Sequence, residues 1–213
     1  FILALYHNPS RSLRESDLPE PKSVIILGHS MGGVVARTML RMPNYQEHTV
    51  NTIVTLSAPH ARAPARMDAR PVLAALPQWP HHRATANPLA DVTLVSVAGG
   101  GLDTMIPSES TSLTSLVPDT HGFTVFTSSI PNVWTGMDHL AIMWCDQFRK
   151  ALVKAVFDVT DVRRSAQTKP QAERIKAIRK RLLTGMEPVV QKSIKGQGEL
   201  YVINLFFDCA NSW

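Results

Sequence analysis

The motif GHSMG at residues 28–32 constrains this chain more than any other stretch of its sequence. A short β-branched run, residues 23–27, precedes the motif, and small and apolar residues follow it at positions 34–40. The first run is typical of a buried strand, and the second is typical of a helix packed on a sheet. A GxSxG motif in this setting predicts a nucleophile elbow, a sharp turn that exposes a serine at the edge of a sheet.

Four residues of the motif have a predicted role. Ser30 is the candidate nucleophile, and the backbone N–H of Met31 is the candidate donor to an oxyanion. We expect glycine at Gly28 and Gly32 because side chains there would collide with the neighbouring strand and helix. The alternative interpretation is a glycine-rich structural turn whose serine has no chemical role.

The rest of the chain alternates between strand and helix patterns. Buried strands are predicted within residues 51–60, 91–101 and 123–129, and helices within 140–159 and 168–185. Thr168 is the candidate N-cap of the second helix. Residues 61–90 hold five prolines and no clear period, which indicates a loop or lid. This alternation predicts an α/β fold with a doubly wound, mostly parallel sheet. Ligands bind such sheets beyond the carboxyl ends of the strands.

A serine hydroxyl needs a general base, and the base needs a carboxylate that orients it. In the α/β-hydrolase order the acid follows the serine and the histidine follows the acid. We choose Asp103 as the acid because it lies just past a predicted strand, in a glycine-rich loop. Asp91 begins that strand and so lies at the opposite end of the sheet, whereas Asp119 sits in an unremarkable turn. A solvated turn aspartate is the alternative for Asp103.

His139 is the candidate general base, because it follows the last predicted strand and precedes a helix. The other seven histidines break the expected order or lie at the wrong end of a strand: His7, His29, His48, His60, His81, His82 and His121. A polar residue at a helix N-terminus is the alternative for His139. His60 follows a strand and is a candidate pocket residue, with a role in the turn as the alternative. Asp138 is expected to cap the next helix, and the alternative is that it holds the loop of His139.

Composition narrows the classes of function. Hydrophobic residues make up 44% of the chain and charged residues 18%, as in a globular protein with a core. The net charge of +5 is concentrated in residues 168–185, so nucleic-acid binding is not indicated. Cys145 and Cys209 predict neither a disulfide framework nor a metal site, and no metal or other cofactor is expected. The basic helix is interpreted as a solvated face, with a membrane-surface role as the alternative.

The sequence resembles the GPI inositol-deacylases, endoplasmic-reticulum enzymes that remove the acyl chain from the inositol of GPI anchors. The similarity lies in VIILGHSMGGVVARTML, NTIVTLSAPH, LADVTLVSVAGGGLDTMIPSESTSLTSLVP and GFTVFTSSIPNVWTGMDHLAIMWCDQFRKAL. It implies that Ser30 attacks the acyl ester while His139 takes its proton and Asp103 orients the imidazole. A GPI-anchor lipid or GPI-anchored protein is the implied substrate, in an enzyme needed for export of GPI-anchored proteins from the endoplasmic reticulum.

The resemblance also bears on how the chain is organised. It predicts an α/β-hydrolase domain over residues 1–160 that lacks its N-terminal strands, then a basic helix and irregular tail over 161–213. We expect the chain to be an internal fragment, with the second oxyanion donor upstream and membrane-anchoring segments elsewhere in the parent protein. The alternatives are a general lipase or carboxylesterase of the same fold, and a catalytically incomplete fragment.

Overall fold

Four parallel strands form one sheet in the order β1-β2-β3-β4. The computed structural model describes residues 23–40, 42–45, 48–62, 90–163 and 167–184. The strands are β1 (Val24–His29), β2 (Val50–Leu56), β3 (Thr93–Ala98) and β4 (Gly122–Phe126). Strand order follows chain order, and each strand pairs in parallel with the next. The predicted parallel α/β sheet is thus confirmed.

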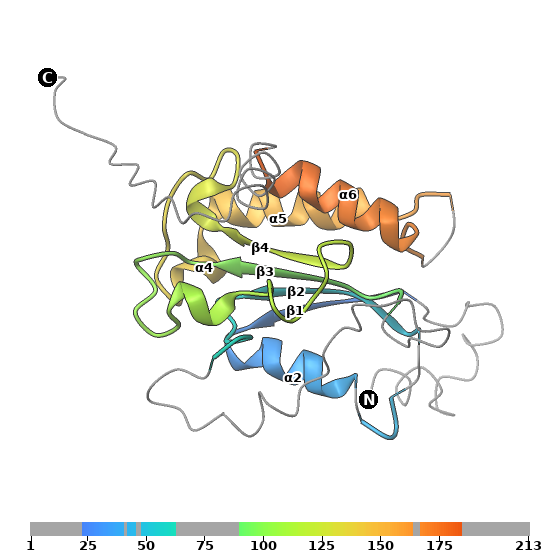
Figure 1. Ribbon diagram of the computed structural model, residues 1–213. Helices are drawn as coiled ribbons and strands as arrows, with labels where there is room; N and C mark the ends of the chain where they lie inside the picture. The colour runs from blue at the N-terminus through green and yellow to red at the C-terminus, as the bar shows by residue number, and fades with distance from the viewer. Residues whose placement is uncertain (1–22, 41, 46–47, 63–89, 164–166, 185–213) are drawn as a thin grey trace, which may run out of the picture.

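Helices cover both faces of the sheet (Figure 1). Helix α2 (Met31–Met39) lies on one face, while α5 (Asp146–Val159) and α6 (Gln171–Leu182) lie on the other. Strands covered on both faces have continuous apolar sequences rather than alternating ones. Every residue of β2 and β3 is buried accordingly. Short elements follow the carboxyl ends of the strands: η2 (Ser108–Thr111), η3 (Thr127–Ser129) and α4 (Ala141–Trp144).

Strand β1 differs from the two central strands. Among the described strands it pairs only with β2, and Leu27 at its middle is 56% exposed. The nucleophile candidate therefore follows a strand at the edge of the described sheet. The predicted loop or lid at 61–90 and the irregular tail fall almost wholly outside the described residues, as do His7, His81, His82 and Cys209. Cys145 is a free cysteine.

Two helix predictions need correction. The predicted helix at 140–159 is two helices, α4 and α5, because the extended backbone of Cys145 separates them. Thr168 does not cap α6, whose N-cap is Pro170. Its hydroxyl instead accepts a hydrogen bond from the side-chain amide of Asn51, 2.7 Å away. Proline has no N–H to leave unpaired, so it suits the start of a helix.

The basic helix α6 contributes to the hydrophobic core on the face of the sheet that α5 and α6 cover. Its apolar side chains Ile175, Ile178 and Leu182 join a cluster with residues of α5 and the strands. Arg174 is 2% exposed and donates hydrogen bonds to Asn51 O at 3.2 Å and Asp91 Oδ1 at 3.1 Å. These contacts anchor α6 to the amino ends of β2 and β3. Helices α5 and α6 thus share a core across the division predicted at residue 160, which stays a prediction.

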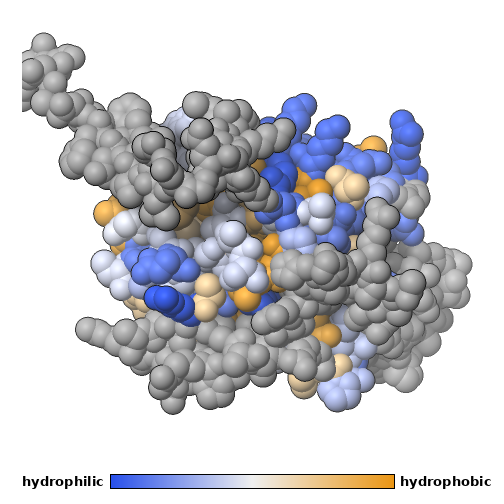
Figure 2. Space-filling model, in the orientation of Figure 1, coloured by the Kyte–Doolittle hydropathy of each residue, from blue (hydrophilic) through white to orange (hydrophobic). Residues whose placement is uncertain are grey.

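The charged face of α6 makes intramolecular contacts as well. Arg179 lies over the Phe123 ring at 4.8 Å and donates to Asp119 O at 2.8 Å, and Arg181 pairs with Asp158 at 2.7 Å. Hydrophilic side chains project outward where α6 lies (Figure 2). Arg179 and Arg181 are half-buried and contact neighbouring elements, whereas Lys176 and Lys180 are exposed. No helix in the described parts of the chain has the length and apolarity to cross a bilayer.

Candidate active site

Ser30 occupies the sharp turn between β1 and α2. Its backbone has φ 53° and ψ −126°, a conformation that residues with a side chain rarely adopt. Such a conformation costs about 1–3 kcal/mol and persists only where the surroundings impose it. Two hydrogen bonds do so here: Ser30 N–H donates to Leu56 O at 2.9 Å, and Gly33 N–H donates to Ser30 O at 3.1 Å. The strained turn has the form predicted for a nucleophile elbow.

Only one of the two predicted glycines is sterically required. A Cβ at Gly28 would lie 2.8 Å from Gly33 N and 2.9 Å from Gly32 O, so the turn excludes a side chain there. The steric role predicted for Gly32 is wrong, because a Cβ there would meet no described atom within 4 Å. Gly33 has that role instead, since its Cβ would lie 2.5 Å from Ala58 Cβ and 2.9 Å from Thr55 Cγ2. Of the adjacent residues Gly32 and Gly33, Gly33 is therefore the one that lies against the sheet.

Met31 is the first residue of α2, and its N–H is among those that have no acceptor within the helix. The first N–H groups of a helix, together with the helix dipole, favour negative charge at this end. The backbone at Met31 therefore has the electrostatic character that an oxyanion donor needs.

Asp103 and His139 come together although 36 positions separate them in sequence. His139 Nδ1–H donates to Asp103 Oδ2 at 3.1 Å, and both residues are buried, at 7% and 4% exposure. The other carboxylate oxygen, Oδ1, accepts the N–H groups of Ile106 at 2.9 Å and Met105 at 3.1 Å. Because Nδ1 carries the proton of the neutral ring, Nε2 is left as an acceptor. A base that takes a proton from a serine hydroxyl needs this tautomer.

His29 joins the elbow to His139, which the order argument did not foresee. Its Nε2–H donates to the carbonyl oxygen of His139 at 2.8 Å, and the two ring centroids lie 4.6 Å apart. Since His29 directly precedes Ser30, this contact brings His139 beside the elbow. His29 was set aside as a general base because it precedes the serine. Its position next to the nucleophile was the available signal for a supporting role.

The loops that carry the acid and the base also contact each other through Gly99. Its carbonyl oxygen accepts Met137 N–H at 2.8 Å and the Thr127 hydroxyl at 3.1 Å. A Cβ at Gly99 would lie 2.5 Å from Met137 O and 3.2 Å from Asp103 Cβ, so only glycine allows this approach. The glycine-rich sequence before Asp103 therefore serves loop packing as well as turning.

Asp138 has the capping role predicted for it. Its Oδ1 accepts the N–H groups of Leu140 and Ala141, both at 2.8 Å, at the start of α4. These hydrogen bonds lower the pKa of the exposed Asp138 carboxyl, and the bond from Ala141 N–H has the larger effect. The contact fixes the backbone that directly follows His139.

His60 lies in the core rather than in a cleft open to solvent. The residue is 2% exposed, and its two ring nitrogens contact Arg37 at 3.2 Å and Thr55 at 2.7 Å. Burial, and then the charge of Arg37, lower the pKa of His60 to about 3. Burial likewise lowers the pKa of Arg37 to about 10. At neutral pH His60 is therefore an uncharged imidazole beside a charged guanidinium.

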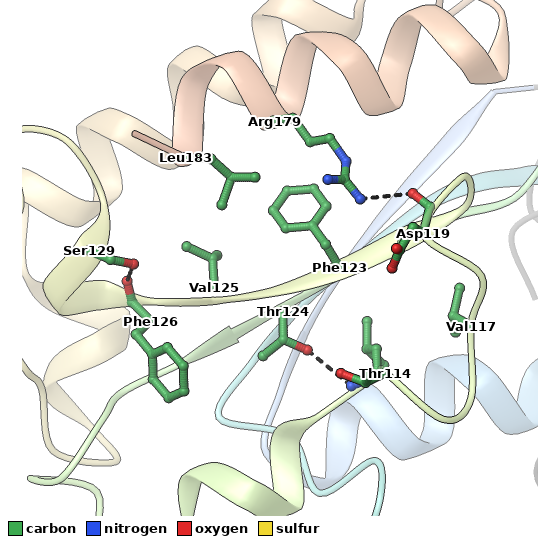
Figure 3. A pocket seen from close by; sticks show the side chains of 12 residues that line it. Thr114, Val117, Asp119, Phe123, Thr124, Val125, Phe126, Ser129, Arg179 and Leu183 are labelled. Carbon is green, nitrogen blue, oxygen red and sulfur yellow. Dashed lines mark hydrogen bonds between the residues drawn. The ribbon is translucent and has the colours of Figure 1, made fainter. Parts of the chain in front are cut away.

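A cavity of about 200 Å³ lies on the outer side of β4, away from these residues (Figure 3). Phe123 and Arg179 face it from β4 and α6, and Thr114, Val117 and Asp119 line its other side. Its lining includes none of the predicted site residues, so it bears on packing at the sheet edge. Within the described ranges, no group of three or more His, Cys, Asp or Glu side chains could hold a metal ion.

The arrangement brings three kinds of group to the carboxyl ends of β1 and β3. It holds a strained serine, an imidazole oriented by a buried carboxylate, and a helix start that favours negative charge. Together these groups have the properties that nucleophilic acyl transfer requires.

Comparison with known proteins extends these observations. The family described as the PGAP1-like alpha/beta domain matches residues 1–159. GPI inositol-deacylase of Neurospora crassa is 58% identical over 96% of the chain, and that of Chaetomium globosum is 58% identical over 91%. GPI inositol-deacylase of Phaeosphaeria nodorum is 52% identical over 99% of the chain. The chain spans only 17% of the first two relatives and 21% of the third.

Proposed function

The chain belongs to the PGAP1-like α/β domain family, and from that premise we propose that it carries the catalytic centre of a GPI inositol-deacylase. The proposed reaction is hydrolysis of the fatty acyl ester on the inositol of a GPI anchor. Ser30 is the nucleophile, His139 the general base and acid, and Asp103 the residue that orients His139. The observation that carries the proposal is the Asp103–His139 pair beside the strained Ser30 turn.

In the first half-reaction, His139 Nε2 takes the hydroxyl proton of Ser30 as Oγ attacks the ester carbonyl carbon. The carbonyl oxygen becomes an oxyanion, to which Met31 N–H donates at the start of α2. The bond from the carbonyl carbon to the inositol oxygen then breaks, and His139 returns the proton to that oxygen. The products are inositol with a free hydroxyl and an ester between Ser30 and the fatty acid.

Water completes the cycle in the second half-reaction. His139 takes a proton from the water, whose oxygen attacks the acyl carbon of the Ser30 ester. The proton passes to Ser30 Oγ as the bond breaks, which releases the fatty acid and restores the enzyme. Asp103 stays ionised throughout and stabilises the imidazolium that forms on His139.

The partners and location follow from the family and are part of the same proposal. The substrate is a GPI-anchor lipid or a GPI-anchored protein, and the site of action is the endoplasmic-reticulum membrane. Removal of the acyl chain there precedes export of the anchored protein. Attachment to the membrane is assigned to parts of the parent protein outside this chain.

Two measurements on the intact protein test the proposal. A fluorophosphonate probe should label Ser30, and Ser30→Ala should abolish both labelling and acyl release. Acyl release from an acyl-inositol GPI should exceed release from a simple triglyceride. Equal rates on the two substrates would indicate a general lipase rather than a GPI inositol-deacylase. An unlabelled Ser30 in the folded protein would contradict any serine-hydrolase role.

A further inference from the structure

A buried chain of hydrogen bonds runs from α2 through β2 to β3. Arg37 on α2 contacts His60 Nδ1 at 3.2 Å, and His60 Nε2 contacts the Thr55 hydroxyl at 2.7 Å. The Thr55 hydroxyl in turn donates to Val95 O on β3 at 3.3 Å. Arg37, His60 and Thr55 are at most 2% exposed. The mechanism above gives none of these three residues a role.

The direction of every hydrogen bond in the chain is determined by its ends. A guanidinium has only donors, so His60 Nδ1 must accept from Arg37. The neutral ring then carries its proton on Nε2, which donates to Thr55 Oγ1. Thr55 uses its own proton toward the carbonyl of Val95. One tautomer of His60 satisfies all three contacts, and the other tautomer would set an N–H of His60 against Arg37.

The same face of α2 contacts the end of β2 one helical turn earlier. Gly33 lies so close to Thr55 and Ala58 that a Cβ would approach them to 2.9 Å or less. Arg37 is four residues further along α2 and therefore lies on the same face. The helix is thus held against residues 55–60 at two points, Gly33 and Arg37. Arg37 therefore adds a polar contact to residues 55–60 one helical turn beyond the close approach of Gly33.

We propose that His60 is a positioning residue, which holds α2 through Arg37 and so fixes the directions of Met31 N–H and the Ser30 side chain. Both groups sit where α2 begins, and the strained backbone of Ser30 persists only where its surroundings impose it. This inference rests on the proposed function, since orientation of these groups matters only if Ser30 reacts. His60 would then affect the reaction rate without contacting the reacting atoms.

The test compares three variants of the intact protein, none of them at a residue that the proposed mechanism uses. His60→Leu removes both ring nitrogens. His60→Gln keeps one acceptor and one donor on a single amide, at a spacing close to that of the imidazole nitrogens. Thr55→Val keeps the volume and removes only the hydroxyl, which leaves the Nε2–H group of His60 without its acceptor. The measurements are kcat, KM and the rate at which a fluorophosphonate labels Ser30, taken below the unfolding temperature of each variant.

The expected result is a loss in kcat and labelling rate without a change in KM. His60→Leu should lower both rates about tenfold or more, because small displacements of reacting groups cost up to ~10²-fold. Thr55→Val should lower them by about threefold, and His60→Gln should recover most of the loss. A residue that only stabilises the fold would lower the unfolding temperature of these variants and leave kcat of the folded protein unchanged.

Each outcome decides between the two proposals. Unchanged kcat in folded Thr55→Val and His60→Leu, or no recovery in His60→Gln, overturns the positioning role and leaves the hydrolase intact. If His60→Leu does not fold, Thr55→Val and His60→Gln still give the decisive comparison. If the unmodified protein is not labelled at Ser30, the proposed function fails, and the positioning role fails with it.

Discussion

His139 Nδ1 lies 3.1 Å from Asp103 Oδ2, while the second oxygen of the same carboxylate accepts two backbone N–H groups of its own loop. The two oxygens therefore have separate tasks. Oδ1 fixes the carboxylate to residues 105 and 106, and Oδ2 fixes the ring of His139. The carboxylate is buried and cannot rotate without losing both sets of bonds. Since its oxygens can only accept, Nδ1 of His139 must carry the proton that it donates to Oδ2.

Asp103→Asn should abolish most activity without unfolding the protein. The backbone donors retain the amide oxygen, so the amide NH₂ group must face His139 Nδ1. That nitrogen then has to accept, the proton moves to Nε2, and Nε2 can no longer take the proton of Ser30. We expect kcat to fall by about 10³–10⁴-fold, as for loss of the correct tautomer in a serine triad. Acyl release from an acyl-inositol GPI is the measurement.

Asp119→Asn is the matched control, since Asp119 is exposed and follows the acid loop without contacting His139. It should leave kcat unchanged. Equal losses in the two variants would show that the effect of Asp103→Asn is not specific to the pair. Full activity in Asp103→Asn would remove Asp103 from the proposed triad.

The sheet could be predicted from sequence because its strands are covered on both faces. Runs rich in β-branched residues mark β2 and β3, and the residues that end them lie at the carboxyl edge as expected. Details that depend on tertiary contacts were not predictable in this way. Threonine is a common N-cap residue, but the Thr168 hydroxyl accepts a hydrogen bond from the side chain of Asn51, 117 positions away. A local pattern carries no information about such a partner.

Some features of the candidate site could likewise be predicted from the sequence, and others depend on tertiary contacts. Chain order and strand ends suffice to select Asp103 and His139, which the structure brings together. The contact of His29 with His139 and the close approach of Gly33 to Ala58 join segments that meet only in the folded chain. Gly33 lies just past the GHSMG motif, so the spacing of the motif cannot show that this glycine approaches the sheet.

His29→Leu should slow the reaction by releasing the backbone of His139. The His29 Nε2–H group holds the carbonyl oxygen of His139 at 2.8 Å, and leucine offers no donor. We expect kcat to fall about tenfold, because His139 loses part of its orientation toward Ser30. His29→Gln is the matched variant, since its amide places a donor near the position of Nε2 and should retain most of the rate. Equal rates in both variants would show that the hydrogen bond does not position His139.

Gly33→Ala and Gly32→Ala should differ in stability although the two residues are neighbours. An added Cβ at Gly33 would lie 2.5 Å from Ala58 Cβ, and overpacking of this kind costs about 1–3 kcal/mol. An added Cβ at Gly32 meets no described atom, and replacing a helical glycine with alanine favours the helix by about 0.5–1 kcal/mol. Urea unfolding of the two variants measures the difference. A larger loss in Gly32→Ala would restore the role first predicted for that residue.

His60 should make the free energy of unfolding depend on pH below neutrality. Burial and the charge of Arg37 lower the pKa of His60 to about 3, against 6.5 for an exposed histidine. Above pH 6.5 the ring is neutral in both the folded and unfolded states, so it adds no dependence. Between these two values the unfolded chain binds a proton that the folded protein excludes. The free energy of unfolding therefore falls as the pH falls, by up to about 1.4 kcal/mol per pH unit from this group.

His60→Gln isolates this contribution, because glutamine keeps an acceptor and a donor but does not titrate. Urea unfolding of the intact protein and of the variant should be compared at matched values from about pH 6 to about pH 4, within the window set by the two pKa values. Carboxylates that titrate in the same range are common to both proteins and cancel in the difference. The variant should lose less stability than the parent with each step toward acid. Parallel curves would mean that His60 binds its proton equally in the folded and unfolded states, and would contradict an Nδ1 that accepts from Arg37.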